Sequence, residues 1–336
     1  MTQRRFRNLI GAAALALAAG SPLNGQAAEN LPSTQTATPA EAQDVADNFA
    51  FEKAKGDRLT VPVSIDGKGP YRFLVDTGAE RTVISEELAR ELSLGAGADA
   101  RMHTMSGVGN VDTVIIPKLK VSARTVKGIN APALSRYHLG AEGMLGVDSL
   151  QSQRVLFDFV KNSMTISPSR VEEEHYDGDT IVVTARSKFG RLILADARAD
   201  GQKVWVIIDT GSQVTIGNEA LRRKLSKKKR LPPTVPIQLV SVTGGTVQAD
   251  YTRISGLIMG GVTLTDMPIA FTDAHPFRKL GLTDKPAMLL GMDALGVFDR
   301  VTVDFANRRV RFSVPDAVNG SQRSLAANLG KTSAIR

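Results

Sequence analysis

Most of the chain follows the period-two pattern of strands rather than the longer period of helices. Leu59–Ile65 alternates apolar and polar residues and then reaches the turn sequence Asp66-Gly67. Val114–Ile116 and Ile181–Val183 are short β-branched runs of the kind that strands favour. Helical periodicity is limited to two brief stretches, Glu86–Leu92 and Glu219–Leu225. The pattern predicts a mainly β protein with one or two short helices in each half.

The same blocks of sequence occur twice in the chain, in the same order. Three pairs of segments match: Phe73–Ala79 with Val206–Ser212, Met144–Leu150 with Leu289–Leu295, and Arg154–Phe159 with Arg300–Phe305. In the first pair, an apolar run leads directly into Asp-Thr-Gly. In the second pair, another apolar run leads into Leu-Gly. Three blocks in one order indicate a duplicated unit of about 110–130 residues. We therefore expect two homologous lobes.

The first segment has the layout of a secretory signal peptide. Basic residues at Arg4, Arg5 and Arg7 precede the apolar run Leu9–Ala19, and small residues follow near Ala28. An uncleaved N-terminal anchor is the alternative, although the apolar run is too short to span a bilayer. The layout predicts a periplasmic or secreted protein, cleaved near Ala28, with no stable membrane insertion afterwards.

Composition shifts divide the rest of the chain. The expected divisions are a signal peptide at 1–28, a flexible lead-in at 29–50, an N-terminal lobe at 51–170, an acidic linker at 171–178, a C-terminal lobe at 179–315 and a flexible tail at 316–336. Whether the lead-in acts as a propeptide stays open at this point.

Composition removes several classes of chemistry. The 336 residues include no cysteine, which excludes disulfides, thiolate metal sites and a thiol nucleophile. The four histidines lack metal-ligand spacing, so we expect no metal and no cofactor, and each histidine is interpreted as a surface or capping residue. The formal net charge is +8, and its densest part is Arg222–Arg230. This run could bind nucleic acid or a membrane surface, but a solvated helix end is favoured because nothing aromatic or Gly-rich surrounds it.

The two Asp-Thr-Gly triplets are the strongest chemical signal. A carboxylate that emerges from an apolar strand is costly unless it is hydrogen-bonded or paired. If the lobes pack about a pseudo-twofold axis, Asp76 and Asp209 meet there. Two adjacent carboxyl groups share one proton and supply a general acid and a general base together. The alternative is that both triplets are Asp-Gly-type turns, inherited by duplication, that have no catalytic role.

These blocks resemble the aspartic proteases of the retropepsin and pepsin clan, most closely bacterial secreted proteins with two retropepsin-like units in one chain. The resemblance covers most of 55–314. It implies two β-barrel-like lobes of the acid protease fold, related by a pseudo-twofold axis, with Asp76 and Asp209 as the catalytic dyad. It also implies a supporting turn around each Asp, formed by Thr77, Gly78 and Ala79 and by Thr210, Gly211 and Ser212. The two threonines would link the turns, and segments at Gly146 and Gly291 would pack behind them.

The resemblance further implies hairpin flaps that cover the substrate. The expected tips are Ser106, Gly107, Val108, Gly109 and Asn110 in the first half, and Val242, Thr243, Gly244 and Gly245 in the second. Ordinary Gly-rich turns are the alternative for each. No tyrosine lies between Arg101 and Asp112, which resembles retropepsins more than pepsins.

Two functions remain from different classes. The first is an aspartic endopeptidase that binds an extended polypeptide substrate as an added strand, acts as a monomer because both lobes lie in one chain, and takes no nucleic acid. The second is a catalytically inactive peptide-binding module that keeps the fold. We also expect the Ser212 hydroxyl to bond the ionised dyad, so that Ser212→Ala would move the acid limb of a pH–rate profile upward.

Overall fold

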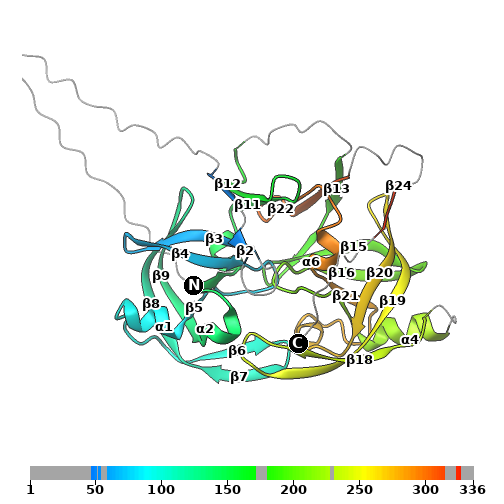
Figure 1. The fold of residues 1–336 in the computed structure, drawn as a ribbon, viewed down its shortest axis with the longest axis horizontal. Coiled ribbons are helices and arrows are strands. Elements are labelled where there is room, and N and C mark those ends of the chain that lie inside the picture. The colour runs from blue at the N-terminus through cyan, green and yellow to red at the C-terminus, as the bar shows by residue number, and fades with distance from the viewer. Residues whose placement is uncertain are drawn as a thin grey trace, which may run out of the picture. The chain divides into compact units, whose positions relative to one another are not determined.

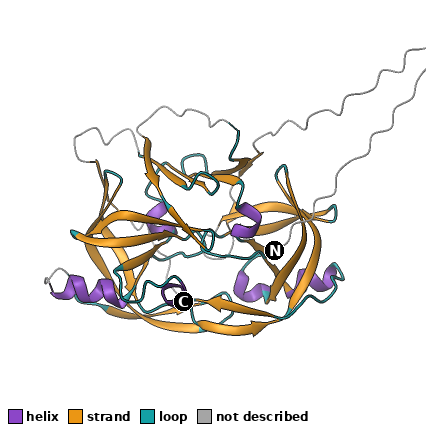
Figure 2. Ribbon diagram, turned by 180° about the vertical axis from the view of Figure 1, so that it is seen from behind, coloured by secondary structure: helices purple, strands orange, loops and turns teal. Residues whose placement is uncertain are grey.

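The computed structural model describes residues 47–50, 52–53, 59–171, 180–227, 231–314 and 323–326. The predicted signal peptide, the lead-in up to residue 46, the linker beyond residue 171 and most of the tail lie outside these ranges. Within them, strands predominate and the helices are short (Figures 1 and 2).

The first lobe is a closed ring of six strands. In ring order they are β3 (Leu59–Ile65), β4 (Lys68–Val75), β10 (Gly143–Leu145), β5 (Val83–Ser85), β9 (Arg124–Leu134) and β8 (Thr113–Val121). Pairing of β8 with β3 closes the ring, and the short β2 (Glu52–Lys53) extends it beside β3. Val61, Val63 and Ile65 alternate inward along β3 and are buried, which is the period that Leu59–Ile65 predicted.

The second lobe repeats the same ring. Its strands are β15 (Arg191–Ala199), β16 (Gln202–Ile208), β21 (Ala287–Leu290), β17 (Ile216–Gly217), β20 (Val262–Phe271) and β19 (Thr246–Met259). Pairing of β15 with β19 closes it. Two strands flank the ring, β14 (Arg186–Lys188) and β18 (Val235–Val240). The identical order of strands confirms the predicted fold of two homologous β-barrel-like lobes.

A third sheet is assembled from both lobes. Its order is β1 (Asp47–Ala50), β12 (Ser163–Pro168), β11 (Gln153–Asp158), β22 (Arg300–Asp304), β23 (Arg309–Ser313) and β13 (Thr180–Thr184). The two repeated Arg-to-Asp segments pair antiparallel at its centre, so that Leu156 lies opposite Thr302. Asp158 lies opposite Arg300, whose Nε donates to Asp158 Oδ2 at 2.8 Å. Equivalent residues therefore face one another about the pseudo-twofold axis.

Six short helices complete the described residues. They are α1 (Glu86–Glu91), α2 (Arg136–Leu139) and α3 (Val147–Leu150) in the first lobe, and α4 (Glu219–Lys227), α5 (His275–Lys279) and α6 (Met292–Leu295) in the second. Ser85 Oγ caps α1 by accepting from the Leu88 N–H, and Asn218 Oδ1 accepts from the Leu221 N–H at the same place in α4. Both helices lie where the periodicity predicted them. A search of the described residues finds no helix whose length and apolarity would let it cross a membrane.

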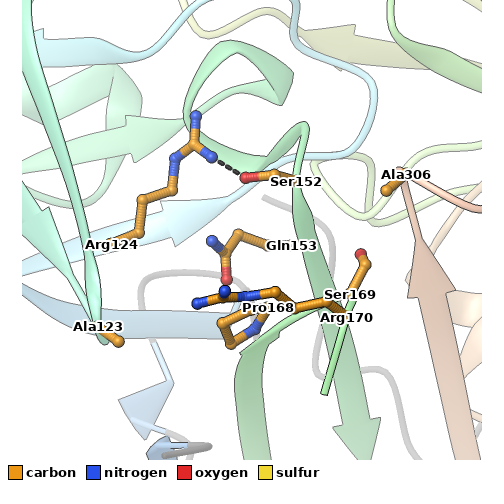
Figure 3. Close-up of a pocket in the computed structure, with 8 residues that line it drawn as sticks. All are labelled: Ala123, Arg124, Ser152, Gln153, Pro168, Ser169, Arg170 and Ala306. Carbon is orange, nitrogen blue, oxygen red and sulfur yellow. Dashed lines mark hydrogen bonds between the residues drawn. The ribbon is translucent and has the colours of Figure 1, made fainter. Parts of the chain in front are cut away.

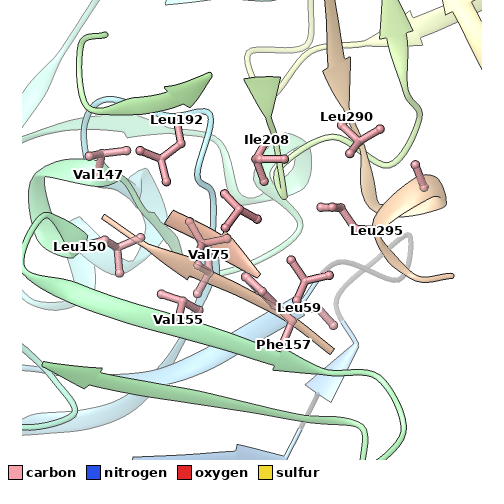
Figure 4. Packing of buried hydrophobic residues seen from close by; sticks show 14 of the residues in the cluster. Leu59, Val75, Val147, Leu150, Val155, Phe157, Leu192, Ile208, Leu290 and Leu295 are labelled. Atoms are coloured by element: carbon pink, nitrogen blue, oxygen red, sulfur yellow. The ribbon is translucent and has the colours of Figure 1, made fainter. Parts of the chain in front are cut away.

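One apolar core runs through both lobes and the shared sheet. Figure 4 shows Val75, Ile208 and Leu290 together with Val155 and Phe157. Each of these side chains is at most 2% exposed. Because the strands that end at the two Asp residues share this core, the core fixes the position of the two Asp-Thr-Gly turns.

Two short strands lie in segments that the sequence predicted to be irregular. β1 pairs antiparallel with β12, and β24 (Arg323–Ala326) pairs parallel with β20. β1 extends the edge of the shared sheet, and β24 pairs with residues 262–265, the part of β20 that β17 does not reach. Such pairing needs no apolar pattern in the added segment, so composition alone could not predict it.

Candidate active site

Each Asp-Thr-Gly turn begins where a buried central strand ends. The Asp76 N–H donates to the Leu145 carbonyl at 3.0 Å, and the Asp209 N–H donates to the Leu290 carbonyl at 3.1 Å. β10 and β21 run parallel to β4 and β16, respectively, and so bring these carbonyls to the turns. The predicted segments before Gly146 and Gly291 thus lie beside the turns.

Two threonines join the turns across the lobes. The Thr77 N–H donates to Thr210 Oγ1 at 3.1 Å, and the Thr210 N–H donates to Thr77 Oγ1 at 3.2 Å. Each hydroxyl also donates to a carbonyl of the opposite strand, Thr77 to Ile208 at 2.9 Å and Thr210 to Val75 at 2.8 Å. Both threonines are buried. The four bonds form a symmetric clamp that holds the two aspartates at a fixed separation.

The two carboxyl groups lie against each other's turns. A Cβ placed on Gly78 would lie 2.6 Å from Asp209 Oδ1, and one placed on Gly211 would overlap the Asp76 carboxylate. Asp76 Oδ1 accepts from the N–H groups of Gly78 (2.7 Å) and Ala79 (3.0 Å), and Asp209 Oδ1 accepts from the Gly211 N–H (3.2 Å). Glycine is therefore needed at both positions for close approach.

The electrostatics of the pair favour one shared proton. Burial, and after it the neighbouring Asp76 carboxylate, raise the pKa of Asp209 to about 7. The Arg191 guanidinium and the N–H groups of Gly211 and Ser212 act in the opposite direction on the pKa of Asp209. A carboxyl group that stays protonated beside an ionised one can act as an acid while its partner acts as a base.

Arg191 is a site residue that the sequence did not reveal. It is 6% exposed at the start of β15, and its Nε donates to the Gly78 carbonyl of the first turn. Its Nη1 lies 3.8 Å from Glu80 Oε1, and Lys279 Nζ donates to Glu80 Oε2 at 2.6 Å. The second lobe thus supplies two cations to the first turn. Only contacts between lobes identify these residues, and sequence spacing carries no such signal.

A second missed feature is a network behind each turn. The N–H and hydroxyl of Thr82 donate to Asp148, and those of Thr215 donate to Asp293. Each threonine oxygen accepts from the N–H of the glycine in the Leu-Gly block, at 3.2 Å in both lobes. All these residues lie within or directly after the repeated blocks, so the repeat was the signal that could have identified them.

The structure corrects the expected role of Ser212. Its Oγ donates to the Val214 carbonyl at 2.7 Å, and the Asp209 carboxylate accepts from the Gly211 main chain. Serine side chains commonly bond a main-chain group of their own loop, and Ser212 does so here. The premise for a Ser212→Ala effect on the pH profile is therefore wrong.

The first predicted flap is a hairpin whose turn lies earlier than expected. β6 (Ala100–Thr104) pairs with β7 (Gly107–Val111), so the turn is Met105-Ser106. Of the predicted tip only Ser106 lies in the turn, while Gly107, Val108, Gly109 and Asn110 belong to β7. A two-residue turn places a positive φ of 149° at Gly107, where it rejoins the ladder.

The second predicted flap segment also lies in a hairpin turn. The turn between β18 and β19 contains Val242, Thr243, Gly244 and Gly245, with the Ser241 N–H donating to the Gly245 carbonyl at 2.7 Å. Gly244 has a φ of 81°, which favours glycine. The turns of the two hairpins meet, since a Cβ on Gly245 would lie 2.5 Å from Ser106 Oγ.

Each flap also contacts the opposite lobe. Met105 packs with an apolar cluster of the second lobe, and Val242 packs with one of the first. The His275 N–H donates to the Met105 carbonyl at 3.2 Å, and Gly244 lies against His138. A cavity of about 230 Å³ lies along the first hairpin and reaches Thr243 of the second.

A second cavity lies apart from these residues. It measures about 360 Å³ and is lined by Ala123, Arg124, Ser152, Gln153, Pro168, Ser169, Arg170 and Ala306 (Figure 3). Arg124 is hydrogen-bonded to Ser152 across it. None of the predicted site residues lines this cavity.

The histidines correct another expectation. His103 Nδ1 and His275 Nε2 are 2.6 Å apart across the lobes, and His138 contacts the second flap. His103 and His138 are exposed, as expected of surface residues, whereas His275 is half-buried; the expectation missed that the fold brings all three to contacts between the lobes. The fourth, His175, lies outside the described residues. The part of the chain that the structure describes holds no group of three or more side chains suited to bind a metal ion.

Comparison with known families matches each half separately. Residues 61–152 match the family described as gag-polyprotein putative aspartyl protease, and residues 195–294 match the family described as aspartyl protease. Each match includes one Asp-Thr-Gly turn and the Leu-Gly block behind it. No curated protein matches the chain significantly.

Proposed function

Because the chain belongs to the aspartyl proteases, with two retropepsin-like units in tandem, we propose that it is an aspartic endopeptidase that uses Asp76 and Asp209. The observation that carries this proposal is the contact of each carboxyl group with the other's turn, held by the threonine clamp. A pKa of about 7 at Asp209 keeps one proton on the pair over a wide range of pH.

The proposed reaction uses that proton twice. The ionised carboxylate accepts a proton from a water molecule as the water oxygen attacks the peptide carbonyl carbon. The protonated carboxyl donates to the carbonyl oxygen, which gives a tetrahedral diol. As the C–N bond breaks, the newly protonated carboxyl donates to the leaving nitrogen, and a diol hydroxyl returns its proton to the other carboxylate. The pair ends with one proton, as it began.

The proposed substrate is an extended polypeptide bound beneath the two flaps. Extended peptides bind through main-chain hydrogen bonds to strand edges, and β6 and β7, which line the cavity, form a sheet of only two strands among the described residues. We further propose that one chain suffices, because both halves of the dyad lie in it. Secretion to a bacterial periplasm or medium, by way of a signal peptide at 1–28, belongs to the same proposal.

The test is cleavage of a mixed peptide library between pH 3 and pH 8, with products mapped by mass spectrometry. We expect Asp76→Asn and Asp209→Asn each to lower kcat by about 10³-fold or more, because each removes a proton-transfer group. Asp284→Asn, at an exposed second-lobe aspartate, is the matched control and should keep full activity.

Activity that survives in either dyad variant would contradict the mechanism. If the wild type binds peptides, measured by fluorescence anisotropy, but cleaves none at any pH tested, the chain is the inactive peptide-binding module instead. Cleavage by the wild type should decline above about pH 7, where Asp209 loses its proton.

A further inference from the structure

The first flap is fastened to the second lobe by an imidazole pair. His103 lies on β6 of the hairpin, and His275 begins α5 of the second lobe. Their Nδ1 and Nε2 atoms are 2.6 Å apart, and their rings stack at 4.9 Å between centroids. Two residues after His103, the carbonyl of Met105 in the turn accepts from the main-chain N–H of the same His275. The pair therefore lies where the hairpin meets the opposite lobe.

This hydrogen bond has a strict protonation requirement. One of the two nitrogens must donate a proton and the other must accept it, so at least one ring has to be neutral. When both rings are protonated, both nitrogens carry hydrogen and the contact becomes repulsive. His103 is exposed and His275 is half-buried, so protons from solvent can reach the pair.

The charged groups around the pair are mostly cationic. Lys279 and Arg278 of α5, Arg101 of β6 and Arg191 of β15 all disfavour a charged ring, and Glu80 of the first turn is the one acid that favours it. Arg278 Nη2 lies 3.4 Å from His275 Nδ1. Burial and these cations lower the pKa of both histidines below the ordinary value. The closed contact thus holds fewer protons than two free imidazoles would.

We propose that His103 and His275 form a latch that keeps the first flap closed while at least one ring is neutral and releases it when both are protonated. Because the closed form binds fewer protons, acid shifts the flap toward the open form, by at most about tenfold in the open-to-closed ratio per pH unit for each proton taken up. The proposal rests on the proposed function, because the flap would cover the cleft in which that function binds the substrate. It means that pH would control access to this cleft.

The second flap offers a built-in comparison. Its turn contacts the first lobe through Gly244 against the His138 ring, without a second imidazole. Protonation of His138 therefore removes no hydrogen bond between two rings. The latch therefore acts on the first flap alone. We expect acid to release the first hairpin while the second hairpin stays in place.

Flap position can be measured without any catalysis. The chain has no cysteine, so Val108→Cys on the hairpin and Asp284→Cys on the second lobe accept one spin label each. Pulsed electron resonance then gives the distance distribution between the labels from pH 7.5 to pH 4.5. We expect a single short population near neutral pH and a growing longer one as the pH falls below the ordinary imidazole pKa.

Two substitutions isolate the latch in this labelled background. His275→Gln and His103→Gln keep a side chain that can accept a hydrogen bond from a protonated ring, so neither should show the acid-dependent longer population. His138→Gln should respond to pH as the wild type does. A wild-type distribution that is independent of pH, or glutamine variants that open in acid like the wild type, would overturn the latch.

The two proposals fail in different ways. Loss of the pH response in both glutamine variants supports the latch even if no peptide is ever cleaved. If the protein is active, the same two variants should flatten the dependence of KM on pH more than that of kcat, because the latch governs access. Equal pH profiles of KM in all variants would contradict it.

Discussion

At the scale of single residues, each half of the site is completed by the other half. The turn glycines are small because the opposite carboxylate occupies the space of a side chain, and the threonines donate to the opposite strand rather than to their own. The sequence identified these residues because each is conspicuous within its own repeat. It could not identify Arg191, which is distinguished by its contacts with Gly78 and Glu80 of the other lobe.

The threonine clamp should contribute measurably to stability. Thr77→Ala removes the acceptor of the buried Thr210 N–H and a donor to the Ile208 carbonyl. Leaving such groups without partners should lower the free energy of unfolding by about 1–3 kcal/mol. Thr77→Ser keeps the hydroxyl and should lose much less. Urea unfolding of both variants measures the difference, and equal stability of the two would show that the clamp contributes nothing.

At the scale of elements, the positions of strands were more predictable than the turns that connect them. Strand positions follow from alternation and from β-branched runs, so β3, β8 and β13 lie where the sequence placed them. The Met105-Ser106 turn was misplaced because the two glycines of β7 resemble a turn, while the actual turn is set by cross-strand register. The His103–His275 contact was inaccessible from spacing, since it depends on how the first flap reaches the second lobe.

The network behind each turn should hold the loop that follows the dyad. Asp148→Ala and Asp293→Ala each remove the acceptor of a buried threonine N–H and hydroxyl. We expect amide hydrogen exchange to quicken by about tenfold or more at residues 79–85 in the first variant and at 212–218 in the second, since about 1–3 kcal/mol of local stability is lost. Mass spectrometry of peptic fragments measures it. Asp284→Ala is the exposed control, and unchanged exchange in both network variants would show that the loops are held by packing alone.

At the scale of the whole molecule, the lobes share a sheet, a core and a pair of turns. The antiparallel pairing of β11 with β22 continues the apolar cluster that contains Val75 and Ile208. Neither lobe can therefore bury its central strand fully without the other. This arrangement explains why the third repeated block matters although it carries no chemistry: the Arg300–Asp158 bond and its register align the lobes about their axis.

The raised pKa of Asp209 makes the stability of the whole molecule depend on pH. Its pKa is about 7 when folded, against an ordinary value of 3.8. Between these two values the folded state binds more protons than the unfolded state, so the free energy of unfolding falls as the pH rises through that window. Above about pH 7 both states are ionised at this position, and the full cost of a buried charge beside Asp76 is present.

Asp209→Asn should remove this dependence, because the amide stays neutral at every pH. We expect the variant to melt higher than the wild type at pH 7.5, by on the order of 5 °C, and the difference to shrink toward zero near pH 4. Differential scanning calorimetry at the two pH values measures it, with Asp284→Asn as the exposed control that should follow the wild type at both. Two results would contradict this prediction: a variant that melts below the wild type at pH 7.5, or a difference in melting temperature that does not change with pH. Either result would mean that the dyad carries no excess proton in the folded protein. The proposed shared-proton reaction would then lose its physical basis.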